Sequence, residues 1–200
     1  MARHTGPKDR LSRREGFDIF GKGGKLTRLN VTPGVHGPKG QRRAPSQYGR
    51  QLREKQKAKR IYGLMESQFA GYMKTALKTK GTTAEVLFRS LESRLDNVVY
   101  RLRFAPTRPG ARQLVSHRHV FVNGKKINIP SYQVKVGDSV SLDEKATKIA
   151  SVKKLLETKE INLPEWLMRK GHIGTVKRVP GRDDVIEPIN EQDIIEFYSR

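Results

Sequence analysis

The sequence predicts an α+β protein: a helical domain, a module of helices packed on a small antiparallel sheet, and an irregular basic N-terminal arm. Apolar residues recur at helical spacing between about residues 47 and 116, which is typical of amphipathic helices. The hydrophobic period then changes to two at Val120, as expected for strands. The first 45 residues contain many Gly and Pro residues, which exclude long helices from that segment.

The chain divides into three predicted segments. Residues 1–45 form the basic N-terminal extension, in which only a short helix near 9–16 is expected, because the segment has little apolar surface to bury. Residues 46–91 form the helical domain, which is completed by a C-terminal helix within 188–200. Residues 92–187 form the module and an extension of its sheet.

Helix signals are clear in the helical domain. Ser46 can cap a helix over 47–62, because a serine hydroxyl accepts a hydrogen bond from an amide of the first turn. Gly63 ends that helix or breaks it. Further helices are expected at 66–78, 83–90 and, at the end of the chain, 190–198.

Apolar residues from Leu91 to Leu102 recur at helical spacing and predict one helix of the module. Pro106 stops this helix, because a proline lacks the amide that would continue it. Arg94 and Arg101 are seven residues apart, so they are expected on one face.

Thr107 can cap the next helix, and Pro109 is tolerated in its first turn. Asn123-Gly124 stands between two apolar alternations, which is the strongest short hairpin signal because a type I′ turn needs positive φ at both central residues. Further strands are expected at 132–136, 139–142 and 173–179. Residues 148–156 fit either a strand or a short helix.

The charge distribution predicts a polyanionic partner. The chain has 41 Lys and Arg against 20 Asp and Glu, for a net charge of +21, and nucleic acid is the usual partner of such proteins. Residues 1–60 hold 17 basic and 4 acidic residues, and residues 92–155 hold 13 and 5, whereas residues 156–200 hold 7 and 9. We therefore expect the nucleic-acid contacts on the first two of these segments.

Several classes of function are disfavoured. No long apolar run and no basic amphipathic helix with bulky apolar anchors indicates a membrane partner, and no apolar stretch at the N-terminus resembles a secretory signal. The absence of Cys removes thiolate catalysis and thiolate zinc sites. We expect no metal, no cofactor and no small-molecule substrate, and a cytoplasmic protein is the simplest interpretation.

Two stretches resemble a known family. The first comprises SRLDNVVYRL at residues 93–102, ARQLVSH at 111–117, VNG at 122–124 and PSYQV at 130–134. It resembles the small RNA-binding module named after small-subunit ribosomal protein four. The second, YGRQLREKQK at 48–57, is similar to the helical region of that ribosomal protein itself. The resemblance covers essentially the whole chain.

The resemblance implies a structural constituent of the small ribosomal subunit and not an enzyme. It implies direct, early binding to the 5′ domain of 16S rRNA, which nucleates subunit assembly. It also implies a location near the channel through which mRNA enters, contacts with neighbouring small-subunit proteins, especially protein five, and an influence on translational accuracy. The chain departs from the family in lacking an N-terminal zinc-binding cysteine cluster, in Pro109-Gly110, and in Arg118, where a small residue is common.

Basic and polar residues in the matching segments are the candidate RNA contacts, because Lys and Arg displace counterions from phosphates and Arg forks onto them. The first candidates are Arg94, Arg101, Arg108 and Arg112. They lie on two successive predicted helices and can form one basic surface; the alternative is that they are merely solvated or pair with Asp96 and Glu92. The other expected rRNA contacts are Arg3, Lys8, Arg10, Arg13, Arg14, Tyr48, Arg50, Arg53, Lys55, Lys57, Lys59, Arg60, Gln113, Ser116, His117 and Lys125. Residues expected near incoming mRNA are Lys39, Arg42 and Arg43.

Two other functions are weighed against this one. An RNA-modifying enzyme would use the module for docking, and Arg94-Leu95-Asp96 resembles the catalytic triplet of pseudouridine synthases. Those enzymes need a separate catalytic domain, so Asp96 is expected instead to pair or cap locally. A free-standing heat-shock or regulatory RNA binder would also use the module, but the basic arm and the 48–57 helix argue against it. Trp166 is expected to anchor a core.

Overall fold

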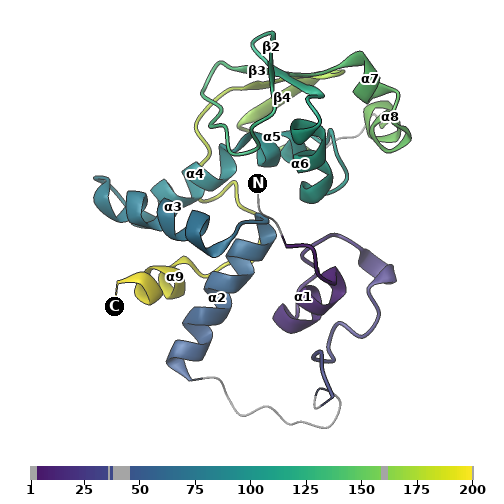
Figure 1. Ribbon diagram of the computed structural model, residues 1–200. Coiled ribbons are helices and arrows are strands. Elements are labelled where there is room, and N and C mark those ends of the chain that lie inside the picture. Colours follow the sequence, from purple (N-terminus) through teal and green to yellow (C-terminus); the bar gives the residue numbers. More distant parts are fainter. Residues whose placement is uncertain (1–3, 36, 38–45, 159–161, 200) are drawn as a thin grey trace. The chain divides into compact units, whose positions relative to one another are not determined.

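The computed structural model describes residues 4–35, 37, 46–158 and 162–199 (Figure 1). The contacts within the chain divide it into two compact units. Unit 1 comprises Met1–Thr79 and Glu187–Arg200, and unit 2 comprises Lys80–Ile186. This division differs from the predicted boundary at residue 91. The helix at 83–92 belongs to unit 2, where it contacts the next helix and where Arg182 lies over the ring of Phe88.

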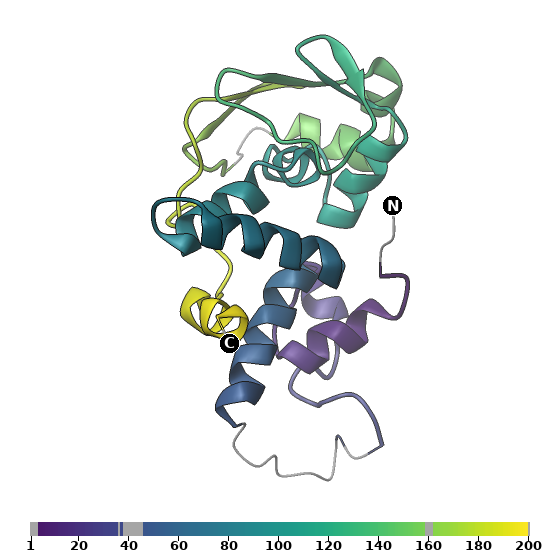
Figure 2. The same ribbon diagram turned by 60° about the vertical axis from the view of Figure 1, so that its left-hand side comes forward.

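Unit 1 is helical. Its elements are α1 (Lys8–Glu15), the 3-10 helix η1 (Gly23–Lys25), α2 (Gln47–Ile61), α3 (Glu66–Lys78) and α9 (Glu191–Tyr198). The four α-helices lie where the sequence predicts them. Ser46 accepts a hydrogen bond from the Gly49 amide, and Asn190 caps α9 by accepting from the amides of Gln192 and Asp193. Helix α9 packs along α2, and α1 also contacts α2 (Figure 2).

Unit 2 combines helices with one antiparallel sheet, which confirms the α+β class. Its helices are α4 (Thr83–Glu92), α5 (Leu95–Arg101), α6 (Arg108–Ser116), α7 (Glu144–Thr147) and α8 (Ala150–Glu157). Its strands are β1 (Val120–Val122), β2 (Lys125–Ile127), β3 (Ser139–Leu142), β4 (Leu167–Lys170) and β5 (Ile173–Val176), in the order β2-β1-β3-β5-β4. The predicted hairpin turn is confirmed by positive φ at Asn123 and Gly124.

The helix predicted from Leu91 to Leu102 is wrong in one respect, because it is interrupted. Helix α4 ends at Glu92, and the backbone of Arg94 is extended, with φ −66° and ψ 137°, before α5 begins. The Leu95 amide donates to the carbonyl of Tyr132 at 2.8 Å. The first amides of any helix lack a partner within the helix and need one elsewhere. At the start of α5, a distant segment of the chain supplies these partners.

The same contact explains why 132–136 is not a strand, contrary to prediction. Its backbone groups bond to the α4–α5 junction instead of to the sheet, and only an isolated bridge joins Gln133 to Arg94. Most of the ambiguous segment 148–156 lies in the helix α8, which ends at Glu157. Strand β4 was not predicted; its partner β5 completes its hydrogen bonding.

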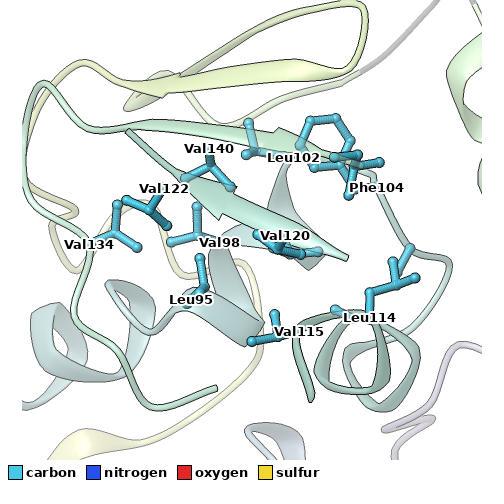
Figure 3. Close-up of a cluster of buried hydrophobic side chains, with 14 of the residues drawn as sticks. Leu95, Val98, Leu102, Phe104, Leu114, Val115, Val120, Val122, Val134 and Val140 are labelled. Carbon is cyan, nitrogen blue, oxygen red and sulfur yellow. The ribbon is translucent and has the colours of Figure 1, made fainter. Parts of the chain in front are cut away.

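One apolar core lies between the sheet and the helices α5 and α6 (Figure 3). Figure 3 shows side chains of both helices pointing toward the strands. The core includes Leu95, Val98, Leu114, Val115, Val120, Val122 and Val140. Trp166 is fully buried in it, as predicted. The exposed sides of α6 and of the β1–β2 hairpin are thereby held in fixed positions.

Gly174 of β5 provides a test of this packing. A Cβ atom there would lie 2.5 Å from two methyl carbons of Leu102, which is itself fully buried. We expect Gly174→Ala to lower the free energy of unfolding by about 1–3 kcal/mol through overpacking, as measured by urea denaturation. Gly71→Ala in α3 is the control, because a Cβ there meets no atom within 4 Å. It should stabilise by roughly 0.5–1 kcal/mol, and equal effects of the two variants would contradict the packing described.

Candidate nucleic-acid interface

Three of the four arginines predicted first are buried in ion pairs. Arg94 is 1% exposed, and its Nε and Nη2 donate to Asp96 Oδ1 and Oδ2 at 3.0 and 2.7 Å. Arg101 donates from Nε and Nη2 to Glu92 Oε2 and Oε1 at 3.0 and 2.8 Å, and Glu92 is fully buried. Bidentate ion pairs of this kind are strong and directional. The expectation that Arg94 and Arg101 share one face of a single helix is wrong, because Arg94 precedes α5, and the pairing alternative is the one observed.

Asn97 extends this network. Its Nδ2 donates to Glu92 Oε2 at 2.7 Å, which orients the amide so that its Oδ1 accepts from Arg108 Nε at 2.8 Å. The half-buried guanidinium of Arg108 lies 4.6 Å from the ring centroid of Tyr100. Positioning on an aromatic ring and an amide leaves Arg108 little freedom to move.

Arg112 is the fourth member and is also buried; its Nη1 lies 3.7 Å from Asp96 Oδ2. Asp96 further accepts from the Asn97 amide at 2.9 Å, and it pairs locally with Arg94, which is one of the two local roles predicted for it. The physical reason for the inward orientation is that buried carboxylates need compensating cations. A direct RNA contact by any of these four arginines remains a prediction.

The exposed side of α6 carries the other predicted contacts. Ala111, Leu114 and Val115 face the core, whereas Gln113 and Ser116 are exposed. His117 and Lys125, from the helix end and from β2, are exposed as well. The exposed basic residues that were not predicted as contacts include Arg103, Arg118 and Lys126. A count of basic residues could have included them, but the sequence alone does not show which arginines are exposed.

Among the described residues, His117 and His119 have no third residue with which to form a metal site. Their ring centroids lie 6.3 Å apart. Within the described part of the chain, no group of three or more His, Asp or Glu side chains is placed to hold a metal ion. None of the described helices is long and apolar enough to cross a membrane.

On α2, several predicted contacts are engaged by carboxylates of unit 1. Arg53 and Arg60 both donate to Glu15 of α1, whose side chain is only 2% exposed. Burial lowers the pKa of Arg60, and the charge of Glu15 partly restores it. Lys57 lies 3.4 Å from Glu54. The two arginine pairs hold α1 against α2, whereas the lysine pair lies within α2, so these cations have a structural role besides any contact with RNA.

Among the remaining predicted contacts, Tyr48 and Arg50 are exposed at the start of α2, and Lys8, Arg10 and Arg14 are exposed on α1. Arg13 instead donates to the carbonyls of Val31 and Thr32 at 2.9 and 3.2 Å, which fixes the loop that follows. Four predicted residues lie outside the described part of the chain: Arg3, Lys39, Arg42 and Arg43.

Glu66 organises the junction of three helices in unit 1. It accepts hydrogen bonds from Lys55 at 2.8 Å, from Lys59 at 2.9 Å and from the Tyr198 hydroxyl at 2.8 Å. Partial burial alone would raise the pKa of Glu66, but these three donors together lower it from 4.5 to about 2. Burial and the bond to Glu66 raise the pKa of Tyr198. The Nζ of Lys55 also lies 4.4 Å from the ring of Phe197.

Known proteins match the chain along its whole length. Residues 3–92 match the family described as "Ribosomal protein S4/S9 N-terminal domain", and residues 93–140 match the S4 domain. The small ribosomal subunit proteins uS4 of Citrifermentans bemidjiense and Geotalea daltonii are each 50% identical over 210 residues, and uS4A of Symbiobacterium thermophilum is 47% identical over 209 residues. Each alignment covers 100% of both chains.

A ribosomal N-terminal domain followed by an S4 domain on an α+β fold defines a class of structural ribosomal proteins. Within that class, the chain belongs to the uS4 family of small ribosomal subunit proteins. This family consists of non-enzymatic components, so the alternative of an RNA-modifying enzyme is excluded.

The buried pairs give the first prediction about this site. Arg101→Met leaves Glu92 buried without its partner, and we expect it to lower the free energy of unfolding by about 3–5 kcal/mol. The double variant with Glu92→Gln should lose less than Arg101→Met alone, because it leaves no uncompensated charge. Arg89→Met, at an exposed position of α4, is the control and should change stability by no more than about 0.5 kcal/mol. A loss at Arg101 no larger than at Arg89 would contradict the network.

The pH dependence of the stability of unit 1 gives the second prediction. Because the pKa of Glu66 is lower in the folded chain than its ordinary value of 4.5, its stabilising contribution is complete above pH 4.5 and is lost as the pH falls toward 2. Glu66→Gln should remove this part of the acid sensitivity, as followed by circular dichroism during acid titration. Tyr198→Phe should raise the pKa of Glu66, as measured by NMR. An unchanged pKa of Glu66 in Tyr198→Phe would contradict the contribution of this hydrogen bond to the pKa.

Proposed function

We propose that the chain is a structural, RNA-binding component of the small ribosomal subunit, which binds the 5′ domain of 16S rRNA directly and nucleates assembly. The observation that carries this proposal is the full-length similarity, at about 50% identity, to proteins named small ribosomal subunit protein uS4. The net charge of +21 supports it, because the phosphates of RNA attract such a protein and release counterions on binding. Its location would then be the ribosome.

Two surfaces, one in each unit, fit this role. In unit 2 the surface consists of the exposed side of α6 and the β1–β2 hairpin, with Gln113, Ser116, His117 and Lys125. In unit 1 it consists of Lys8, Arg10 and Arg14 on α1, with Tyr48 and Arg50 at the start of α2. Amide, hydroxyl and imidazole groups can bond to 2′-hydroxyls and phosphates, while cations supply affinity that does not depend on RNA sequence.

The ion-paired arginines fix the elements that carry the unit 2 surface. The contacts of Arg94, Arg101 and Arg108 fix the junction of α4 with α5 and the start of α6. A surface whose supporting side chains are locked loses less conformational entropy on binding. Alanine at Arg94 or Arg101 would therefore change folding as well as RNA affinity.

We further propose a location near incoming mRNA, contacts with neighbouring small-subunit proteins including protein five, and a contribution to translational accuracy. The support is the resemblance to the family and the basic run that contains Lys39, Arg42 and Arg43. Reversing the charges of Arg42 and Arg43 should disturb mRNA unwinding or decoding in a translation assay. Normal unwinding and normal error rates would count against this part of the proposal.

The central experiment measures binding of the full chain to a transcript of the 16S rRNA 5′ domain, together with its co-sedimentation with small subunits in a sucrose gradient. We expect binding that weakens steeply with salt and incorporation into the subunit. The double variant His117→Ala/Lys125→Gln should bind about tenfold more weakly. The matched control is Lys153→Gln/Lys154→Gln on α8, which removes exposed charge from the same unit and should bind nearly as the wild type. A wild-type chain that ignores this transcript at moderate salt would refute the proposal.

A further inference from the structure

Two helices of unit 2 end in the same unusual way, with an arginine whose backbone is left-handed. Arg103 follows α5 with φ 57°, and Arg118 follows α6 with φ 62°. After α5, the amides of Arg103 and Phe104 donate to the carbonyls of Tyr100 and Val99 at 2.9 and 3.1 Å. This pair of hydrogen bonds is the Schellman motif, in which the left-handed position is normally glycine.

The end of α6 repeats the motif. The amides of Arg118 and His119 donate to the carbonyls of Val115 and Leu114 at 2.9 and 3.0 Å. In both motifs the backbone bonds fix the Cα atom of the arginine relative to its helix. The side chain therefore leaves the helix end in a defined direction.

Two helices of unit 1 end with a glycine at the left-handed position. Helix α2 ends in the same motif with Gly63 at φ 63°; the amides of Gly63 and Leu64 donate to the carbonyls of Arg60 and Lys59. Helix α1 ends with Gly16 at φ 65°. A residue with a Cβ atom is less stable than glycine in this conformation. An arginine at such a position therefore lowers stability relative to glycine.

The side chains of Arg103 and Arg118 are also placed differently from those of their neighbours. Both residues are exposed. Within the part of the chain that the structure describes, no carboxylate forms a salt bridge with either of them, whereas Arg94 and Arg101 are each held by a carboxylate. Arg118 directly follows the exposed residues Ser116 and His117 of the proposed RNA surface.

We propose that Arg103 and Arg118 bind phosphate groups of the folded RNA, and that their strained backbones are kept because a guanidinium is needed at these helix ends. The inference rests on the proposed function and deepens it by naming two contacts. A guanidinium matches the geometry of a phosphate and presents its donors in a rigid fork. The competing explanation is purely structural, since a cation near a helix C-terminus interacts favourably with the helix dipole.

The two explanations predict opposite signs for glycine substitutions. Under the proposal, Arg118→Gly and Arg103→Gly each raise the Tm of the free protein by about 1–3 °C through relief of strain. Each also weakens binding to the 16S 5′ domain transcript about five- to tenfold and reduces the slope of log affinity against log salt by about one. Gain of stability with loss of affinity separates a binding residue from a helix-capping one.

Other substitutions at the same positions separate charge from strain. Arg118→Gln and Arg103→Gln keep a Cβ atom, so they should lose the same affinity without the rise in Tm. Arg103→Lys and Arg118→Lys keep the charge but lose the forked donors of the guanidinium, so these variants should bind the transcript with intermediate affinity. Gly63→Arg calibrates the strain, because a Cβ at Gly63 meets no atom within 4 Å; it should lower Tm by about as much as Arg118→Gly raises it.

The outcomes separate this inference from the function on which it rests. If the wild type does not bind the transcript, the proposed function fails. If the wild type binds and both glycine variants bind equally well with the same salt slope, this inference alone is overturned. Glycine variants with lower Tm and unchanged affinity would assign the arginines to the helix dipole.

Discussion

The structure of unit 2 depends on a buried carboxylate, Glu92, at the junction of α4 and α5. It is fully buried, and it accepts hydrogen bonds from Arg101 and from the side chain of Asn97. A buried charge without such partners would be strongly destabilising. The second pair, Arg94 with Asp96, fixes the extended residue between the two helices. Through Asn97, the same network reaches Arg108 at the start of α6, so one polar network connects the three helices α4, α5 and α6.

Carboxylates compensate part of the chain's large positive charge within each unit. Like charges in close sequence would repel, but in unit 2 Glu92 and Asp96 neutralise two of the arginines, and in unit 1 Glu15 and Glu66 hold cations of α2. Some cations hold helices together, whereas others, including those beside α6 and on α1, are exposed. The folded chain presents the exposed cations at its surface, and their affinity for phosphates depends on salt.

Local signals predicted most of the elements correctly. The capping residues Ser46 and Thr107 and the Asn123-Gly124 turn act through contacts a few residues away, so the sequence contains their whole cause. The break at Arg94 could not be predicted in this way, because it depends on hydrogen bonds to the segment around Tyr132. For the same reason 132–136 resembles a strand in sequence but is not one. The unpredicted strand β4 takes its hydrogen bonds from β5.

The sequence by itself determined the α+β class, the position of nearly every helix, the excess of positive charge and the resemblance to a ribosomal family. Only the tertiary structure decided which arginines are buried in ion pairs and which are exposed. Composition and spacing give the number and the helical face of charged residues, but the partner of a buried charge is set by which distant carboxylate the fold brings within hydrogen-bonding distance. Arg103 and Arg118 show the same limit of the sequence. Their positive φ depends on the residues at which packing ends α5 and α6.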